Sequence, residues 1–168
     1  MSKYSIAILL IVLFSTGWAT TSMSEEDADM VLPPVSIPEV SNFFVEGQRA
    51  SEENRIIMLL ISQTYCPYCE LIKEEIIYPM IRGKDHANRL LIRELHTDKS
   101  AHIRNFDGTV LSARSFAKQH KASLTPTLLF LDGRGNELTE RLVGINTPEM
   151  YFYYVDEAIK KALLAKKG

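Results

Sequence analysis

The sequence predicts an α/β fold with a mixed central sheet of about four strands and helices on both faces. After a first helix, apolar runs of strand length alternate with stretches of helical spacing, in the order β, α, β, α, β, β, α. The run from Arg55 to Ser62 is apolar throughout its interior, which is typical of a strand buried on both faces. A helical crossover gives parallel pairing and a hairpin gives antiparallel pairing, so we expect both kinds in one sheet.

The predicted elements follow the chain as helix 39–50, strand 55–62, helix 67–82, strand 89–96, turn 106–109, helix 112–120, strand 127–132, hairpin loop 132–136, strand 137–143 and helix 147–166. The first helix has Val40, Phe43 and Gly47 at helical spacing. In the second helix Pro67 fits the first turn, where no N–H is needed. Pro79 is expected to kink or end that helix.

Local signals also mark the elements of the second half. Gly108 supplies the turn before the third helix, and Asp132-Gly133-Arg134-Gly135-Asn136 is a hairpin loop of a common type. Thr147-Pro148-Glu149 starts the last helix with a cap residue, a proline and an acid. In that helix, two members of the run Tyr151-Phe152-Tyr153-Tyr154 are expected to face the core.

Length and composition indicate one ordinary globular domain. The chain has 168 residues, of which 46% are hydrophobic and 24% charged, enough for a substantial core. Its formal net charge of −2 provides no basic footprint for nucleic acid, so nucleic acid is excluded as a partner.

The N-terminus predicts an export signal. Lys3 precedes an apolar run from Ile6 to Phe14, and Gly17-Trp18-Ala19 offers small residues for cleavage, so residues 1–19 are expected to be a signal peptide. The apolar run is shorter than the ~20 residues that span a bilayer, although an uncleaved membrane anchor is the alternative. A flexible leader is expected over 20–38 and the folded domain over 39–168.

The chemistry is concentrated in Cys66-Pro67-Tyr68-Cys69, which holds both cysteines of the chain. Cys66 is expected at the N-terminal end of a helix, where free amides and the helix dipole favour a thiolate and depress its pKa. Cys69 can then close the ring and release whatever Cys66 has captured. A purely structural disulfide of this spacing would close a very short loop and add little stability, which favours a redox role.

Metal and haem sites are not expected, and neither is any cofactor beyond the cysteine pair. A zinc site requires four ligands, but the sequence has no second CxxC, and its histidines share no ligand spacing: His86, His96, His102 and His120. Cys69 is followed by Glu70 rather than histidine, which excludes a c-type haem attachment.

Two features of the sequence resemble the thioredoxin fold. One is the cysteine motif between a strand and a helix, Cys66-Pro67-Tyr68-Cys69. The other is Leu124-Thr125-Pro126-Thr127, in which Pro126 follows Cys66 by sixty residues. The resemblance implies a cis proline at Pro126 beside the cysteines, with Thr125 offering backbone hydrogen bonds to an incoming peptide. Pro67 belongs to the same implied substrate groove. Tyr65 and Tyr68 either form an apolar rim of this groove or are simply aromatic residues of a half-exposed turn.

Over residues 39–165 the chain resembles the exported SoxW-like branch of thioredoxin-related proteins. The resemblance is carried by the signal peptide, by Ser62-Gln63-Thr64-Tyr65 before the cysteine motif, by the Phe106-Asp107-Gly108 turn and by the segment 125–132. This resemblance implies thiol–disulfide exchange on disulfide-bearing exported proteins, with electrons delivered by a membrane-embedded donor. It also implies a location in the bacterial periplasm. We expect a monomer. Glutathione dependence is disfavoured, because no Gly-Gly-x-Asp follows the third strand.

One position departs from the thioredoxin pattern. Leu60 occupies the place of the buried aspartate thought to move the proton of the second cysteine. We expect Glu94, on the neighbouring strand, to be buried there and to accept the proton of Cys69. The alternative is that Glu94 faces solvent and pairs with Arg93 or another neighbour.

The leading functional prediction is disulfide reduction, by attack of Cys66 and resolution by Cys69. The same pair could instead donate its disulfide as an oxidant, because direction depends on the reduction potential. A third reading is a non-catalytic binding module or chaperone that presents a groove beside Pro126.

Overall fold

The computed structural model describes residues 34–84, 86–99 and 102–167. The expected signal peptide and residues 20–33 of the expected leader therefore lie outside the described residues. The last residues of that leader contact the domain, because Ile37 is buried and the Pro38 carbonyl accepts a hydrogen bond from the Glu94 amide at 3.1 Å. None of the helices in the described part is long and apolar enough to cross a membrane.

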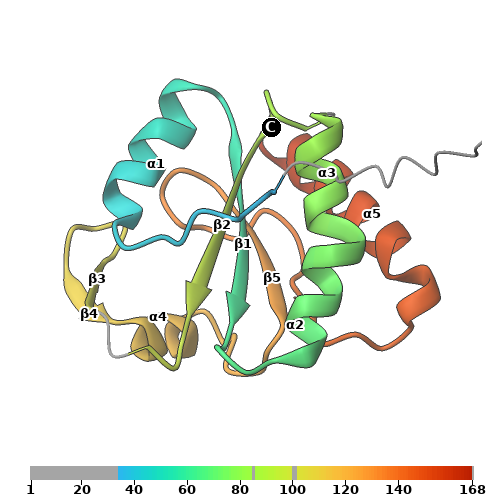
Figure 1. Cartoon of the computed structure of the whole chain (residues 1–168). Coiled ribbons are helices and arrows are strands. Elements are labelled where there is room, and N and C mark those ends of the chain that lie inside the picture. The colour runs from blue at the N-terminus through green and yellow to red at the C-terminus, as the bar shows by residue number, and fades with distance from the viewer. Residues whose placement is uncertain (1–33, 85, 100–101, 168) are drawn as a thin grey trace, which may run out of the picture. The chain divides into compact units, whose positions relative to one another are not determined.

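A four-stranded mixed sheet is the centre of the domain, and it confirms the predicted fold class (Figure 1). Its strand order is β2-β1-β5-β6, with bounds Leu90–His96, Ile56–Ser62, Thr127–Leu131 and Leu142–Val143. β1 pairs in parallel with β2 and antiparallel with β5, and β5 pairs antiparallel with β6. All seven residues of β1 are buried, as its apolar sequence predicts.

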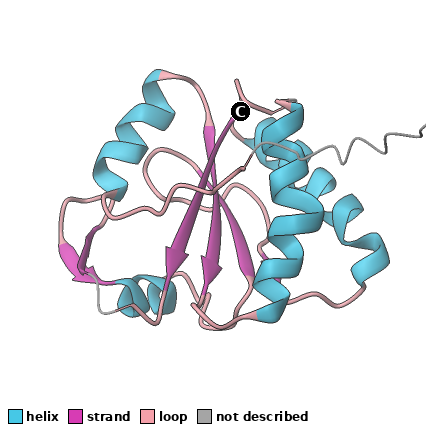
Figure 2. Ribbon diagram, in the orientation of Figure 1, coloured by secondary structure: helices cyan, strands magenta, loops and turns pink. Residues whose placement is uncertain are grey.

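Helices cover both faces of this sheet (Figure 2). On one face lie α1 (Phe43–Glu52) and α4 (Ala113–Gln119), whose Phe43 and Phe116 rings stack with centroids 4.2 Å apart. The other face carries α2 (Pro67–Ile72), α3 (Tyr78–Gly83) and α5 (Tyr151–Ala165). Alternate residues of β1 enter the two cores, which places one set of β1 and β2 side chains against the cysteine-bearing helix.

The chain differs from the prediction where short elements form. α1 begins at Phe43 instead of residue 39, because the Asn42 side chain caps it by accepting from the Val45 amide at 3.2 Å. The preceding residues are extended, with a bridge between Glu39 and Glu94 at the edge of β2. An unpredicted hairpin, β3 (His102–Arg104) and β4 (Val110–Ser112), flanks the predicted turn.

Pro79 does not end the active-site helix. A π-helical turn, Lys73–Ile77, joins α2 to α3, and Pro79 lies in the first turn of α3. A proline cannot donate the usual helical hydrogen bond, and the wider turn just before it accommodates this missing donor. The helix therefore runs from Pro67 to Gly83, close to the predicted range.

The returning strand of the last hairpin is shorter than predicted. Leu131 pairs with Glu137, but Leu128 pairs with Leu142, so four residues of the returning chain face two of β5. The extra residues form a bulge, and regular pairing is confined to β6.

The last helix, α5, buries fewer aromatic residues than predicted. Two members of the run Tyr151-Phe152-Tyr153-Tyr154 were expected in the core, but only Tyr151 is buried.

Candidate active site

Cys66 and Cys69 lie where β1 gives way to α2, and they form a disulfide with Cα atoms 5.2 Å apart. Cys66 is the N-cap residue of α2, and its Sγ accepts a hydrogen bond from the Cys69 amide at 3.2 Å. Cys66 is 8% exposed and Cys69 is fully buried. An incoming sulfur can therefore approach Cys66 but not Cys69.

The Thr125–Pro126 segment lies beside this disulfide. The peptide bond between the two residues is cis, and Thr125 Oγ1 is 3.7 Å from Cys66 Sγ. Thr125 is partly exposed, whereas Pro126 is buried beneath it. Gln63, which the sequence did not single out, lies 3.5 Å from the Thr125 hydroxyl through its Oε1.

The remaining predicted groove residues are exposed around the pair. Tyr65 is 94% exposed and Tyr68 61%, and Pro67 is exposed at the first position of α2. The structure thus brings the predicted cysteines and Thr125 together, with the two tyrosines facing solvent.

Glu94 is buried, at 5% exposure, and does not face solvent. It pairs directly with Leu60 across the β1–β2 register, which is the neighbouring position expected from the sequence. Arg93, its alternative partner, bonds instead to Glu46 at 2.8 Å. Glu94 Oε1 accepts from the Ser62 hydroxyl at 2.6 Å and from Lys73 Nζ at 2.7 Å.

Lys73 and His96 complete a buried polar cluster that the sequence analysis missed. Lys73 follows Cys69 by one helical turn, and its ammonium bridges Glu94 and Glu70. Burial lowers the pKa of Lys73, but the hydrogen bonds to Glu94 and Glu70 outweigh it and raise the pKa overall. His96 Nε2 lies 3.4 Å from Glu94.

A signal for this cluster exists in the sequence. Lys73 lies at helical spacing within the apolar stripe of Cys69, Ile72 and Ile76, so a charged residue occupies a core-facing position. A lysine in that position is seldom buried without a partner. Glu94 and His96 alternate along β2 on the face that meets this stripe.

Asp98 fixes the loop that leads into the disulfide. Its Oδ2 accepts a hydrogen bond from the Thr64 amide at 2.9 Å, and this backbone bond holds the pKa of the Asp98 carboxyl below its usual range. Sequence reasoning gave no signal for this contact.

Among the residues that the structure describes, no group of three or more His, Cys, Asp or Glu side chains could hold a metal ion.

Comparisons with known proteins identify the family of the chain. A family model for the thioredoxin-like domain matches residues 44–159. No curated protein sequence matches the chain significantly.

Three solved structures share the fold. A DsbH oxidoreductase is 16% identical, with a TM-score of 0.55 over 77% of this chain and 90% of its own. A Malassezia sympodialis thioredoxin is 14% identical (TM-score 0.52, 79% and 98%), and a Fasciola hepatica thioredoxin is 15% identical (TM-score 0.50, 75% and 99%).

Proposed function

Because the chain belongs to the thioredoxin-like domain family, we propose that it exchanges thiols and disulfides with other proteins through Cys66 and Cys69. The observation that carries this proposal is the asymmetry of the pair. Cys66 retains 8% exposure at a helix N-terminus beside Thr125, while Cys69 is fully buried. The first is placed to attack and the second to resolve.

We propose the reducing direction. The Cys66 thiolate attacks one sulfur of a substrate disulfide, forming a mixed disulfide and releasing the other substrate sulfur as a thiolate. Cys69 then loses its proton and attacks Cys66 Sγ, which breaks the mixed disulfide and releases the second substrate thiolate. Two electrons pass to the substrate, and the Cys66–Cys69 disulfide remains. The N–H of Cys69, which already donates to Cys66 Sγ, stabilises the attacking thiolate.

Glu94 is the proposed acceptor for the Cys69 proton. It is bonded to Lys73, which follows Cys69 by one helical turn, and His96, partly exposed, lies beside Glu94 as an outlet to solvent. Glu94→Gln should slow resolution of the mixed disulfide about 100-fold, because general-base catalysis contributes effects of this size. Glu46→Gln, which alters an acid on the opposite side of β2, is the matched control and should leave the rate unchanged. An unaltered rate in Glu94→Gln would remove Glu94 from the mechanism.

The cysteine roles are tested by trapping. Cys69→Ser should accumulate mixed disulfides between Cys66 and its partners, detectable on non-reducing gels and abolished by a reductant. Cys66→Ala should form none and should lose exchange with a disulfide substrate. A Cys66→Ala protein that retains its full effect on partners would favour the binding-module alternative and overturn the exchange proposal.

We also propose that this chemistry acts on exported proteins in the bacterial periplasm, in a monomer that uses no cofactor besides its own disulfide. A membrane-embedded donor would return electrons to that disulfide. Fractionation of cells expressing the full chain, combined with N-terminal sequencing of the product, tests export and cleavage after residue 19. Recovery of the uncleaved chain in the cytoplasm would contradict this part of the proposal.

A further inference from the structure

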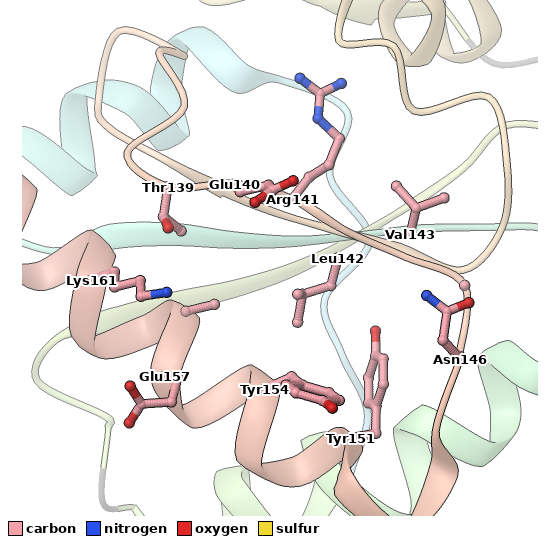
Figure 3. Close-up of a pocket in the computed structure, with 12 residues that line it drawn as sticks. Thr139, Glu140, Arg141, Leu142, Val143, Asn146, Tyr151, Tyr154, Glu157 and Lys161 are labelled. Carbon is pink, nitrogen blue, oxygen red and sulfur yellow. The ribbon is translucent and has the colours of Figure 1, made fainter.

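A cavity of about 260 Å³ lies between α5 and the segment that contains the bulge and β6 (Figure 3). Thr139, Leu142 and Val143 line it from the strand side, and Tyr151 and Lys161 line it from the helix. Bulges concentrate next to functional sites, where they redirect side chains. The cavity is separate from the cysteine pair, whose residues do not line it.

The Tyr151 hydroxyl faces this cavity without a partner. Tyr151 is only 4% exposed, and its oxygen has no hydrogen bond within the described structure. Figure 3 shows the hydroxyl directed between Leu142 and Asn146. Burial raises the pKa of Tyr151, so the group keeps its proton and can donate. A buried donor of this kind is stabilised by an acceptor oxygen that enters the cavity.

Lys161 provides the charge at the other end of the cavity. Tyr151, Tyr154, Ala158 and Lys161 follow one another at helical spacing and line the cavity along about 15 Å of α5. Among the described residues Lys161 has no ion-pair partner, whereas its neighbour Lys160 bonds Asp156 at 2.7 Å and Glu157 at 3.0 Å. A carboxylate is the complementary group.

One end of the cavity is linked to the disulfide site through contacts of the chain. Val143 and Gly144 line the cavity, and the Gly144 amide donates to the Pro126 carbonyl at 2.8 Å. Thr125, which precedes Pro126, lies against Cys66. The Val143–Gly144 end of the cavity is therefore the end nearest to the Thr125–Pro126 segment beside Cys66.

We propose that this cavity binds an extended acidic segment of the protein substrate, with a backbone carbonyl on the Tyr151 hydroxyl and a carboxylate on Lys161. An extended chain advances about 3.3 Å per residue, so four or five residues span the distance. The inference rests on the proposed exchange function and adds the substrate class to it. Glu140 and Glu157 also line the cavity, and they are the groups that would favour a basic segment instead.

The test uses two synthetic peptides that carry one cysteine in a mixed disulfide with a chromogenic thiol, followed by ten residues that are either acidic or their amide counterparts. Ten residues allow the chain to reach the cavity from Cys66 and then to span the stretch between Tyr151 and Lys161. A small chromogenic disulfide without a peptide reports the cysteine chemistry alone. We expect kcat/KM of the reduced protein to be about tenfold higher for the acidic peptide. Tyr151→Phe should lower this value about fivefold, and Lys161→Met about three- to fivefold, as expected for one hydrogen bond and one exposed ion pair.

Lys118→Met is the matched control, because it removes an exposed lysine from α4, on the other face of the sheet from α5. It should leave the peptide preference unchanged, and all three variants should react with the small disulfide as the wild type does. Equal rates for both peptides, or a higher rate with a basic peptide, would overturn the cavity proposal. Failure of the wild type to react with the small disulfide would instead overturn the exchange proposal. Anisotropy of a labelled acidic peptide with serine in place of cysteine measures binding without any reaction. The affinity of Tyr151→Phe for this peptide is expected to be about fivefold lower than that of the wild type.

Discussion

At the residue scale, the Lys73–Glu94 pair is the most consequential buried interaction near the disulfide. Both side chains are less than a tenth exposed, and their charged atoms are 2.7 Å apart. Removing one partner leaves the other charge buried and uncompensated, so Lys73→Met should lower the free energy of unfolding by about 3–5 kcal/mol. Urea denaturation measures this change.

The control for this prediction is the double variant Lys73→Met/Glu94→Leu, which removes both charges. It should recover most of the lost stability, because an apolar pair of similar volume replaces the ion pair. A double variant as unstable as the single one would show that packing, and not the unpaired charge, carries the effect.

The same pair predicts a dependence on alkaline pH. The folded pKa of Lys73 is raised above its ordinary value of 10.5, so its stabilising contribution is complete below that value and is lost as the pH rises through the folded pKa. The stability difference between wild type and Lys73→Met should therefore stay constant from about pH 8 to 10 and shrink above that range. Denaturation curves at matched pH values check it, and a difference that grows with pH would contradict it.

Residues of the site differed in how far the sequence could predict them. Cys66, Cys69 and Thr125 follow from short motifs, and Glu94 followed from the strand register. Contacts such as Lys73 with Glu94 join a helix to a strand, so they depend on how the π-helical turn after α2 packs against β2. No local pattern determines that packing.

At the element scale, α1 depends on Gly47 for its close approach to the last hairpin. A Cβ at this position would overlap the Gly133 carbonyl oxygen and lie 3.0 Å from Phe106 Cδ1. Alanine normally stabilises a helix interior by about 1 kcal/mol relative to glycine, but here the overlap should dominate and cost about 1–3 kcal/mol. Thermal unfolding of Gly47→Ala measures the balance. Gln48→Ala, at an exposed position one residue on, should change stability by less than about 0.5 kcal/mol; greater stability in Gly47→Ala would contradict the packing argument.

Elements with strong periodicity were predictable, and short ones were not. The apolar β1 and β5 and the amphipathic α5 follow from composition and spacing. β3, β4 and β6 have two or three residues each, too few for a periodic signal. Their existence depends on pairing with a neighbour, and the bulge before β6 arises from a register that only the folded sheet defines.

At the scale of the whole molecule, stability and electron flow are linked. The disulfide lies between β1 and α2, which belong to the folded core, so its reduction potential includes any difference in folding stability between the oxidised and reduced forms. A strong oxidant of this chemistry has a stabilised reduced form. A reductase should show the reverse. We therefore expect the oxidised protein to unfold at a higher urea concentration than the reduced protein.

Two independent measurements test this expectation. Equilibration with a thiol buffer should give a reduction potential at or below about −200 mV. The difference in the free energy of unfolding between the oxidised and reduced proteins should agree in sign with this potential. For this two-electron couple, 30 mV corresponds to about 1.4 kcal/mol. Cys66→Ser/Cys69→Ser lacks the couple and should unfold identically with and without reductant. A potential near −120 mV, together with a more stable reduced form, would reverse the proposed direction and make the chain a donor of disulfides. That result would leave the roles of Cys66 and Cys69 intact, because attack and resolution use the same two sulfurs in either direction.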